Sequence, residues 1–109
     1  MGHEVQDRAS LEMARIIAAG LPEHLEWLEL AKANIARWSH RNRDAPSLLR
    51  CYDEWRELLD LPVSEICAIL TDDSDRGRRL RQNSPFPGVL SPREVWAIKA
   101  RCRDEAPTA

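Results

Sequence analysis

The segment LRQNSPFPGVLSPREVW, residues 80–96, contains a stretch that cannot be helical, followed by a strong signal for the start of a helix. Pro85 and Pro87 lack backbone N–H donors, and each restricts the residue before it to an extended conformation. After them, the Ser91 side chain can cap the first turn of a helix, and Glu94 can bond back to the N–H of Ser91. The segment therefore predicts an SPFPG loop that leads into a C-terminal helix.

Apolar side chains recur at helical spacing after this start. Val95, Ile98 and Cys102 share one face, so we expect a helix that ends near Asp104 and buries that face. Leu90, which comes just before the capping serine, is placed to contact Val95 as a hydrophobic staple. Both signals predict that the last helix packs against the rest of the chain.

The chain upstream of residue 80 also shows helical periodicity, interrupted by proline, glycine and short polar runs. The expected helices cover residues 8–19, 22–39 and 46–60, a short segment that begins at Pro62, and another short segment after TDDSD. We expect Gly20 to end the first helix in the left-handed conformation, with Leu21 folding back onto Ile16. The sequence shows no strand-like alternation with hairpin turns. It predicts an all-α fold, a compact bundle of five to six helices with short connections and an SPFPG loop before the C-terminal helix.

Length and composition suit one globular domain. The chain has 109 residues, of which 43% are hydrophobic and 31% are charged. We expect the domain to span residues 8–104, with flexible ends at 1–7 and 105–109. The N-terminal residues lack the cationic start and continuous apolar core of a secretory signal, and no run approaches the length of a membrane helix. These features predict a cytoplasmic protein without a membrane partner.

Few residue patterns point to catalysis or to a bound cofactor. Cys51, Cys67 and Cys102 are far apart and form no CxxC pair, so we interpret them as small apolar residues within helices. The stretch DDSDRG is similar to the start of a calcium loop, but that register puts Arg76 and Asn83 where oxygen ligands are needed. The chain has no glycine-rich phosphate loop and no nucleophile elbow. We therefore expect no catalytic residues, no cofactor and no metal site, in a protein that is not an enzyme.

An arginine-rich helix keeps nucleic-acid binding open as an alternative. SEICAIL, TDDS and DRGRRLRQ, residues 64–82, follow the order of helix, turn and basic helix in a helix-turn-helix motif. However, Asp72 stands where that motif buries an apolar residue, and Gly77 occupies the core-facing position of the basic helix. The net charge of −2 also makes the chain a poor general binder of polyanions. A small DNA-binding regulator that uses the Arg76–Arg81 helix is the alternative hypothesis.

The loop and its flanking helices supply a candidate interaction patch. Phe86 is the single phenylalanine of the chain, and its position between two prolines makes it a low-entropy plug. We interpret it first as a plug for the core of this chain, while a partner's pocket and a ligand site are the other interpretations. The candidate patch consists of Arg78, Arg79, Arg81, Gln82, Asn83, Phe86 and Trp96.

Three segments carry a resemblance to a family: NIARW at 34–38, EWRELLDLPVSEICAIL at 54–70, and the 80–96 stretch. Together they resemble short helical bacterial proteins that end in an LRQ-SPF-G-L-S/T-P-E-W pattern, over roughly residues 30–103. Pro87 departs from this pattern, which has a small residue such as alanine there, so the resemblance does not predict the detailed shape of the loop. Such proteins occur beside nucleotidyltransferase-type toxin–antitoxin genes, and the resemblance therefore implies a small partner-binding or neutralising subunit.

The sequence as a whole favours a non-enzymatic helical module that acts through protein–protein interaction. Its partner would be another protein or a second copy of the chain. The resemblance would make it an accessory subunit of a toxin–antitoxin or phage-related locus.

Overall fold

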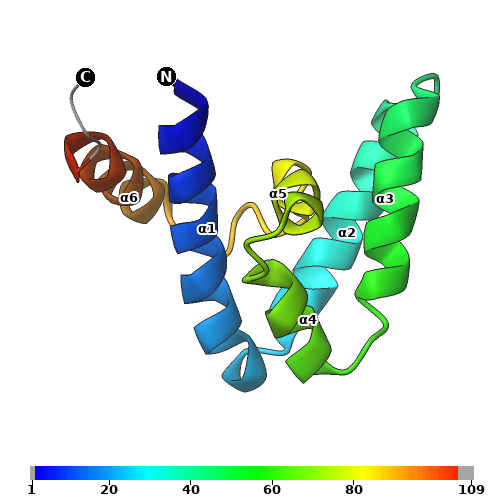
Figure 1. The fold of residues 1–109 in the computed structure, drawn as a ribbon. Helices are drawn as coiled ribbons and strands as arrows, with labels where there is room; N and C mark the ends of the chain where they lie inside the picture. Colours follow the sequence, from blue (N-terminus) through cyan, green and yellow to red (C-terminus); the bar gives the residue numbers. More distant parts are fainter. Residues whose placement is uncertain (1, 106–109) are drawn as a thin grey trace.

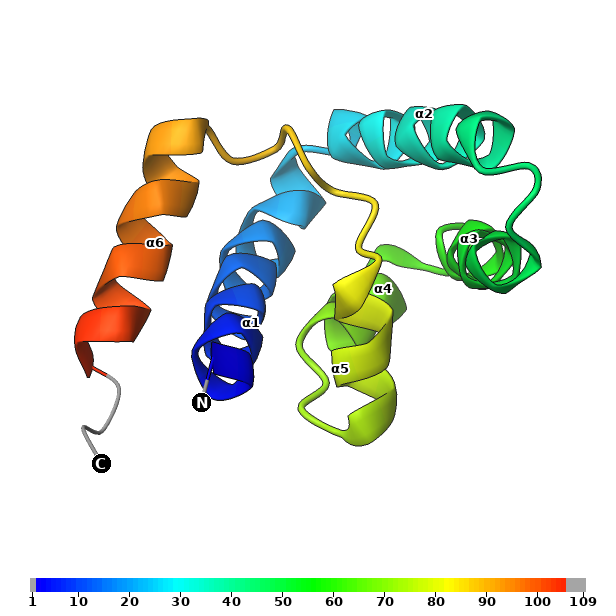
Figure 2. The same cartoon turned by 90° about the horizontal axis from the view of Figure 1, so that it is seen from above.

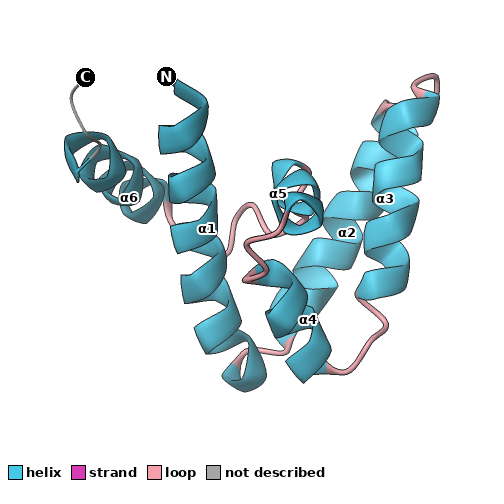
Figure 3. Ribbon diagram, viewed as in Figure 1, coloured by secondary structure: helices cyan, strands magenta, loops and turns pink. Residues whose placement is uncertain are grey.

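The computed structural model describes the backbone of residues 2–105 and the side chains of residues 5–105. Within these residues the chain forms six α-helices and one short 3-10 helix, and no strand (Figure 3). The elements are α1 (Gly2–Gly20), the 3-10 helix η1 (Leu21–Glu23), α2 (Glu26–Arg41), α3 (Pro46–Leu58), α4 (Val63–Leu70), α5 (Asp75–Gln82) and α6 (Pro92–Glu105). The predicted all-α bundle, with short connections and a loop before the last helix, is confirmed.

Two helical pairs with α4 and α5 between them make up the bundle (Figure 1). α2 and α3 lie side by side and antiparallel, and α1 contacts α4, α5 and α6. α6 packs mainly against α1 and runs antiparallel to it (Figure 2). An ion pair of 3.2 Å between Arg8 and Glu105 joins the beginning of α1 to the end of α6. α6 is therefore an outer helix, held chiefly by its contact with α1.

The apolar core is divided in two. The main cluster joins residues from α1, η1, α2, α3, α4, α5 and the SPFPG loop. Its most buried large side chains include Leu21, Ile35, Trp55, Ile66, Leu70 and Phe86. A smaller cluster of Ala9, Ile98 and Cys102 lies between α1 and α6, with Val5, Met13 and Leu90 packed against it. Since α6 buries only one narrow stripe, most of its surface is exposed.

The SPFPG loop crosses the molecule and places Phe86 inside it. Phe86 is 2% exposed and meets Trp55 edge-on, with ring centroids 6.4 Å apart. The buried side-chain amide of Asn34 donates hydrogen bonds to the carbonyl oxygens of Pro85, at 2.9 Å, and Pro87, at 3.1 Å. Gly88 then turns the chain with a φ of 100°, a conformation that favours glycine. The interpretation of Phe86 as a plug for this chain's own core is confirmed.

The start of α6 has the predicted capping box. The Ser91 hydroxyl accepts a hydrogen bond of 3.1 Å from the N–H of Glu94, and a Glu94 carboxylate oxygen accepts one of 3.0 Å from the N–H of Ser91. The carboxylate is held by hydrogen bonds from the backbone and side chain of Ser91, which keep the pKa of Glu94 below its usual range. Four consecutive residues thus suffice to fix where this helix begins.

The structure corrects two predictions about the first helix. α1 begins at Gly2 rather than at the expected residue 8. That the two ends of the chain are flexible stays a prediction, and Met1 and 106–109 lie outside the described residues. Gly20 is right-handed, with φ −92° and ψ −19°, because the chain continues directly into η1. Its lack of a side chain serves another purpose, since a Cβ there would lie 2.6 Å from the Trp27 ring. Leu21 is fully buried in the main core, whereas Ile16 is 41% exposed.

Candidate functional site

The arginine-rich helix α5 is bonded to acids of its own chain. Ser74 caps it by accepting a hydrogen bond from the N–H of Gly77. Arg79 makes a two-pronged contact with Glu54 on α3, at 3.0 and 3.2 Å, and Arg76 approaches the same carboxylate at 3.6 Å. The hydrogen bond from Arg79 holds the pKa of Glu54 below its ordinary value. This face of α5 is therefore directed at α3.

Arg78 is paired in the same way. Its guanidinium lies 3.4 Å from Asp75 and 3.8 Å from Asp73, two of the acids that precede or begin α5. These contacts are exposed to water, so each contributes little to folding. They do, however, lower the positive potential of α5, because its exposed arginines are already paired with carboxylates of this chain. This weakens the attraction of the helix for a phosphate.

Arg81 is not part of an exposed cluster, which corrects the predicted patch. It is 6% exposed, and its guanidinium donates hydrogen bonds to the carbonyl oxygens of Leu70, at 3.2 Å, and Asp72, at 2.5 Å. Arg81 therefore satisfies carbonyls at the C-terminal end of α4, which would otherwise lack partners. The close approach depends on Gly77, because a Cβ there would lie 1.9 Å from the Asp72 carbonyl oxygen.

The remaining residues of the predicted patch do not form one surface. Gln82 is exposed and Asn83 is half-buried at the end of α5, and Phe86 lies in the core. Trp96 is 70% exposed on α6, the most exposed large apolar side chain among the described residues. α6 packs mainly against α1, whereas Arg79 faces α3, so the structure does not bring Trp96 together with the arginines.

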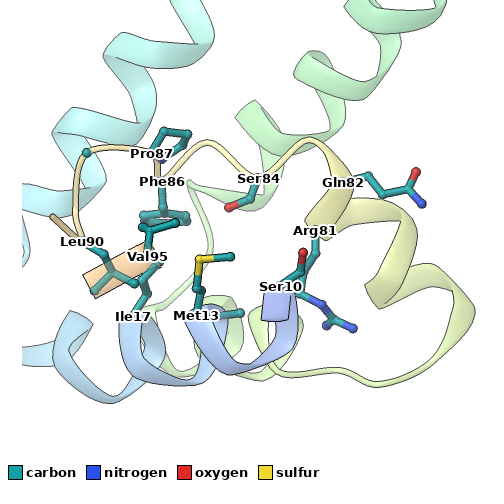
Figure 4. Close-up of a pocket in the computed structure, with 12 residues that line it drawn as sticks. Ser10, Met13, Ile17, Arg81, Gln82, Ser84, Phe86, Pro87, Leu90 and Val95 are labelled. Atoms are coloured by element: carbon teal, nitrogen blue, oxygen red, sulfur yellow. The ribbon is translucent and has the colours of Figure 1, made fainter. Parts of the chain in front are cut away.

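A cavity of about 300 Å³ lies between α1, the SPFPG loop and the start of α6 (Figure 4). Its apolar lining residues are Met13, Ala14, Ile17, Phe86, Leu90 and Val95. The close-up shows the side chains of Met13, Ile17, Phe86, Leu90 and Val95 gathered at one end of the cavity. Ser10, Arg81, Gln82 and Ser84 lie at its other end. The guanidinium of Arg81 is directed toward α4, so its aliphatic part is what faces the cavity. The cavity therefore offers mainly apolar contact.

A second cavity, of about 620 Å³, extends the first along α1. The two cavities share Ser10, Met13, Arg81 and Gln82, so they form one continuous depression. We call it the α1 groove; α1 supplies its floor from Val5 to Ile17, α5 and the SPFPG loop form one wall, and α6 forms the other. Lys99 and Arg103 line the α6 wall at the end away from the loop.

The sequence did not reveal this groove. The sequence predicts a helix over residues 8–19, but helical periodicity does not say which of its residues a neighbouring helix will cover. The one signal available was Trp96, which was included in the predicted patch and is the exposed aromatic on the adjoining helix.

No family model, curated protein or solved structure matches this chain. Among the described residues, no three histidine, cysteine or acidic side chains gather as a metal site would require. None of the described helices combines the length and apolar character needed to cross a bilayer.

Proposed function

We propose that this chain is a non-enzymatic helical module that binds another protein through the α1 groove and the neighbouring face of α6. The observation that carries the proposal is a tryptophan, 70% exposed, on the helix that forms one wall of an apolar groove. Lys99 and Arg103 follow Trp96 by three and seven residues, so all three lie on one face of α6. Exposed apolar surface beside a groove is typical of protein-binding sites, and tryptophan is the residue most enriched at their energetic centres.

The chemistry of the groove supports binding rather than catalysis. Arg81 is the charged residue shared by both of its cavities, and its guanidinium is engaged with the carbonyls of Leu70 and Asp72. The end of the groove beside the SPFPG loop therefore offers a ligand aliphatic and aromatic surface. Such a surface recognises apolar side chains.

The pairing of the α5 arginines makes the alternative, a DNA-binding regulator, the weaker proposal. Arg76 and Arg79 share Glu54, Arg78 is close to Asp73 and Asp75, and Arg81 is buried. A phosphate would have to displace these acids, and it would meet their negative charge as it approached.

The proposal also includes the compartment in which the module acts and the origin of its partner. We propose that the module acts in a reducing cytoplasm, which suits the three cysteines, all of them free thiols. That its partner is encoded in a toxin–antitoxin or phage-related locus rests on the sequence resemblance alone.

The proposal can be tested by placing a photo-crosslinking amino acid at position 96 in cells of the source organism. Irradiation should yield one dominant protein adduct, identified by mass spectrometry, or a covalent dimer if the partner is a second copy. The matched control carries the same amino acid in place of Ala36, an exposed residue of α2, and should not give that adduct. Equal adducts from both positions, or none from position 96, would overturn the proposal.

A second measurement addresses the alternative directly. Fluorescence anisotropy with a generic DNA duplex should show no binding tighter than about 10 μM at physiological salt. Tighter binding that falls steeply with salt, and that is lost when Arg78 and Arg79 are both replaced by alanine, would favour the DNA-binding regulator instead.

A further inference from the structure

The charges that line the α1 groove are unevenly distributed. Burial lowers the pKa of the Arg81 guanidinium, while the charges of Asp73, Asp72 and Asp7 act in the opposite direction. Asp7 and Arg81 line the same cavity, and the Arg81 guanidinium donates hydrogen bonds to the carbonyl oxygens of Leu70 and Asp72.

The other two charged lining residues, Lys99 and Arg103, are basic, and both belong to α6. Lys99 makes no ion pair with any described side chain, and the ion-pair contact of Arg103 is with the adjacent Asp104, at 4.0 Å. Both side chains are exposed. Among the described residues this wall of the groove is thus basic, and its two cations are exposed where an incoming acid can reach them.

The shape of the groove is set by a helix as its floor. The lining residues of α1 run from Val5 to Ile17, which at about 1.5 Å per residue corresponds to a length of about 18 Å. α5 and α6 stand on either side of this floor as walls, so a further helix laid between them would complete the packing around α1. Met13, which lies in the floor of both cavities, can adjust its shape to an incoming side chain.

We propose that the α1 groove binds an amphipathic helix of about three turns whose flank facing α6 is acidic. This inference rests on the proposed function and adds the chemical identity of the partner. Apolar residues of the partner, at i, i+3 or i+4, and i+7, contact Met13 and Ile17 on the floor. Its acids lie against Lys99 and Arg103, and Trp96 extends the contact along the outer edge of α6.

The two ends of the groove also assign a direction to the bound helix. The end beside Phe86, Leu90 and Val95 is apolar and receives the largest apolar anchor. The opposite end carries Lys99 and Arg103, which favour the negative end of a helix dipole. The C-terminus of the partner helix therefore lies at the Lys99 and Arg103 end.

The test uses the purified full-length chain and a displayed library of helical peptides about four turns long. Every peptide carries the same apolar stripe, and its flanking positions vary among glutamate, lysine and serine. The wild-type chain should enrich peptides with glutamate along one flank. The double variant Lys99→Glu/Arg103→Glu should instead enrich peptides with lysine on that flank. At low salt it should bind the peptide that the wild-type chain enriches about tenfold more weakly than the wild-type chain does.

A matched charge reversal serves as the control. Arg43→Glu/Arg50→Glu changes the same number of charges on the α2–α3 side, away from the groove, and should leave the enriched peptides unchanged. Circular dichroism of all variants checks that they remain folded. Peptides with no preference for acid, or the same preference in both double variants, would overturn the proposal.

Blocking the groove gives a readout that does not depend on charge. Ser10 lines both cavities, so Ser10→Trp should fill the groove and abolish peptide binding, whereas Ala36→Trp on the exposed face of α2 should not. Binding that survives Ser10→Trp would show that the peptide occupies another surface. A protein adduct from position 96 together with failure of these peptide experiments would leave the proposed function standing and remove the acidic helix as its partner.

Discussion

Asn34 on α2 donates a hydrogen bond of 2.9 Å from its buried side-chain amide to the carbonyl oxygen of Pro85, 51 residues later in the chain. A second bond from the same nitrogen, 3.1 Å long, reaches the carbonyl oxygen of Pro87. One asparagine thereby satisfies both proline carbonyls of the SPFPG loop and fixes the backbone on each side of Phe86. The loop in turn forms part of the wall of the α1 groove, so Asn34 supports the candidate site from behind.

The first prediction concerns this asparagine. Asn34→Ala should lower the free energy of unfolding by about 2 kcal/mol, because two carbonyls lose their donor in a buried region. Urea denaturation of the variant and the wild type measures the difference. Asn83→Ala is the matched control, since the Asn83 side chain makes no hydrogen bond to the described residues and should cost about 0.5 kcal/mol or less. Equal losses in both variants would contradict the role of Asn34.

The second prediction separates two aromatic residues that the sequence grouped in one patch. Phe86→Ala should cost about 3 to 4 kcal/mol, because its ring is 2% exposed and packs on Trp55. Trp96→Ala should change stability by about 0.5 kcal/mol or less, since that side chain is 70% exposed. Thermal and urea denaturation test both values. A large loss of stability from Trp96→Ala would mean that its ring is part of the fold and not of a docking surface.

The third prediction concerns the buried arginine. Arg81→Met keeps an apolar stem of similar shape but leaves the carbonyls of Leu70 and Asp72 without their donor, so it should cost about 3 kcal/mol. Arg78→Met removes only exposed ion pairs and should cost about 0.5 kcal/mol or less. If denaturation midpoints of the two variants coincide, Arg81 does not hold the end of α4.

The fourth prediction is a pH dependence of α6. Because hydrogen bonds from Ser91 hold the folded-state pKa of Glu94 below its ordinary value of 4.5, the ionised carboxylate contributes stability that is complete above that value. This contribution is lost as the pH falls through the lowered pKa of the folded state. The protection factors of amides in the first turn of α6, which compare the observed exchange rate with the chemical exchange rate at the same pH, should therefore fall between pH 7 and about pH 3.

Two variants test the cap that produces this effect. Glu94→Gln keeps an acceptor for the N–H of Ser91 but cannot ionise, so it should flatten the pH dependence. Ser91→Ala removes the other half of the box and should cost about 1 kcal/mol at neutral pH. A pH dependence that is unchanged in Glu94→Gln would assign it to another carboxylate.

Features governed by neighbouring residues could be predicted from the sequence. The capping box of Ser91 and Glu94 depends on four consecutive residues, and all of its atoms are close together as soon as one turn of helix forms. The helical periodicity of each segment likewise predicted the all-α class. Phe86 was assigned to the core because two prolines restrict it locally, before any tertiary contact is considered.

Only the tertiary structure decided the burial and contacts of residues whose neighbours come from distant segments of the chain. Arg81 belonged by sequence to a basic cluster, yet Gly77 lets α5 approach the end of α4, and the guanidinium is buried against its carbonyls. Gly20 makes room for the Trp27 ring, although by sequence it resembled a left-handed helix end. The α1 groove exists because α5 and α6 pack on separate sides of α1. Periodicity gives each helix an apolar face, but the position of one helix relative to another is set by contacts between residues far apart in the chain.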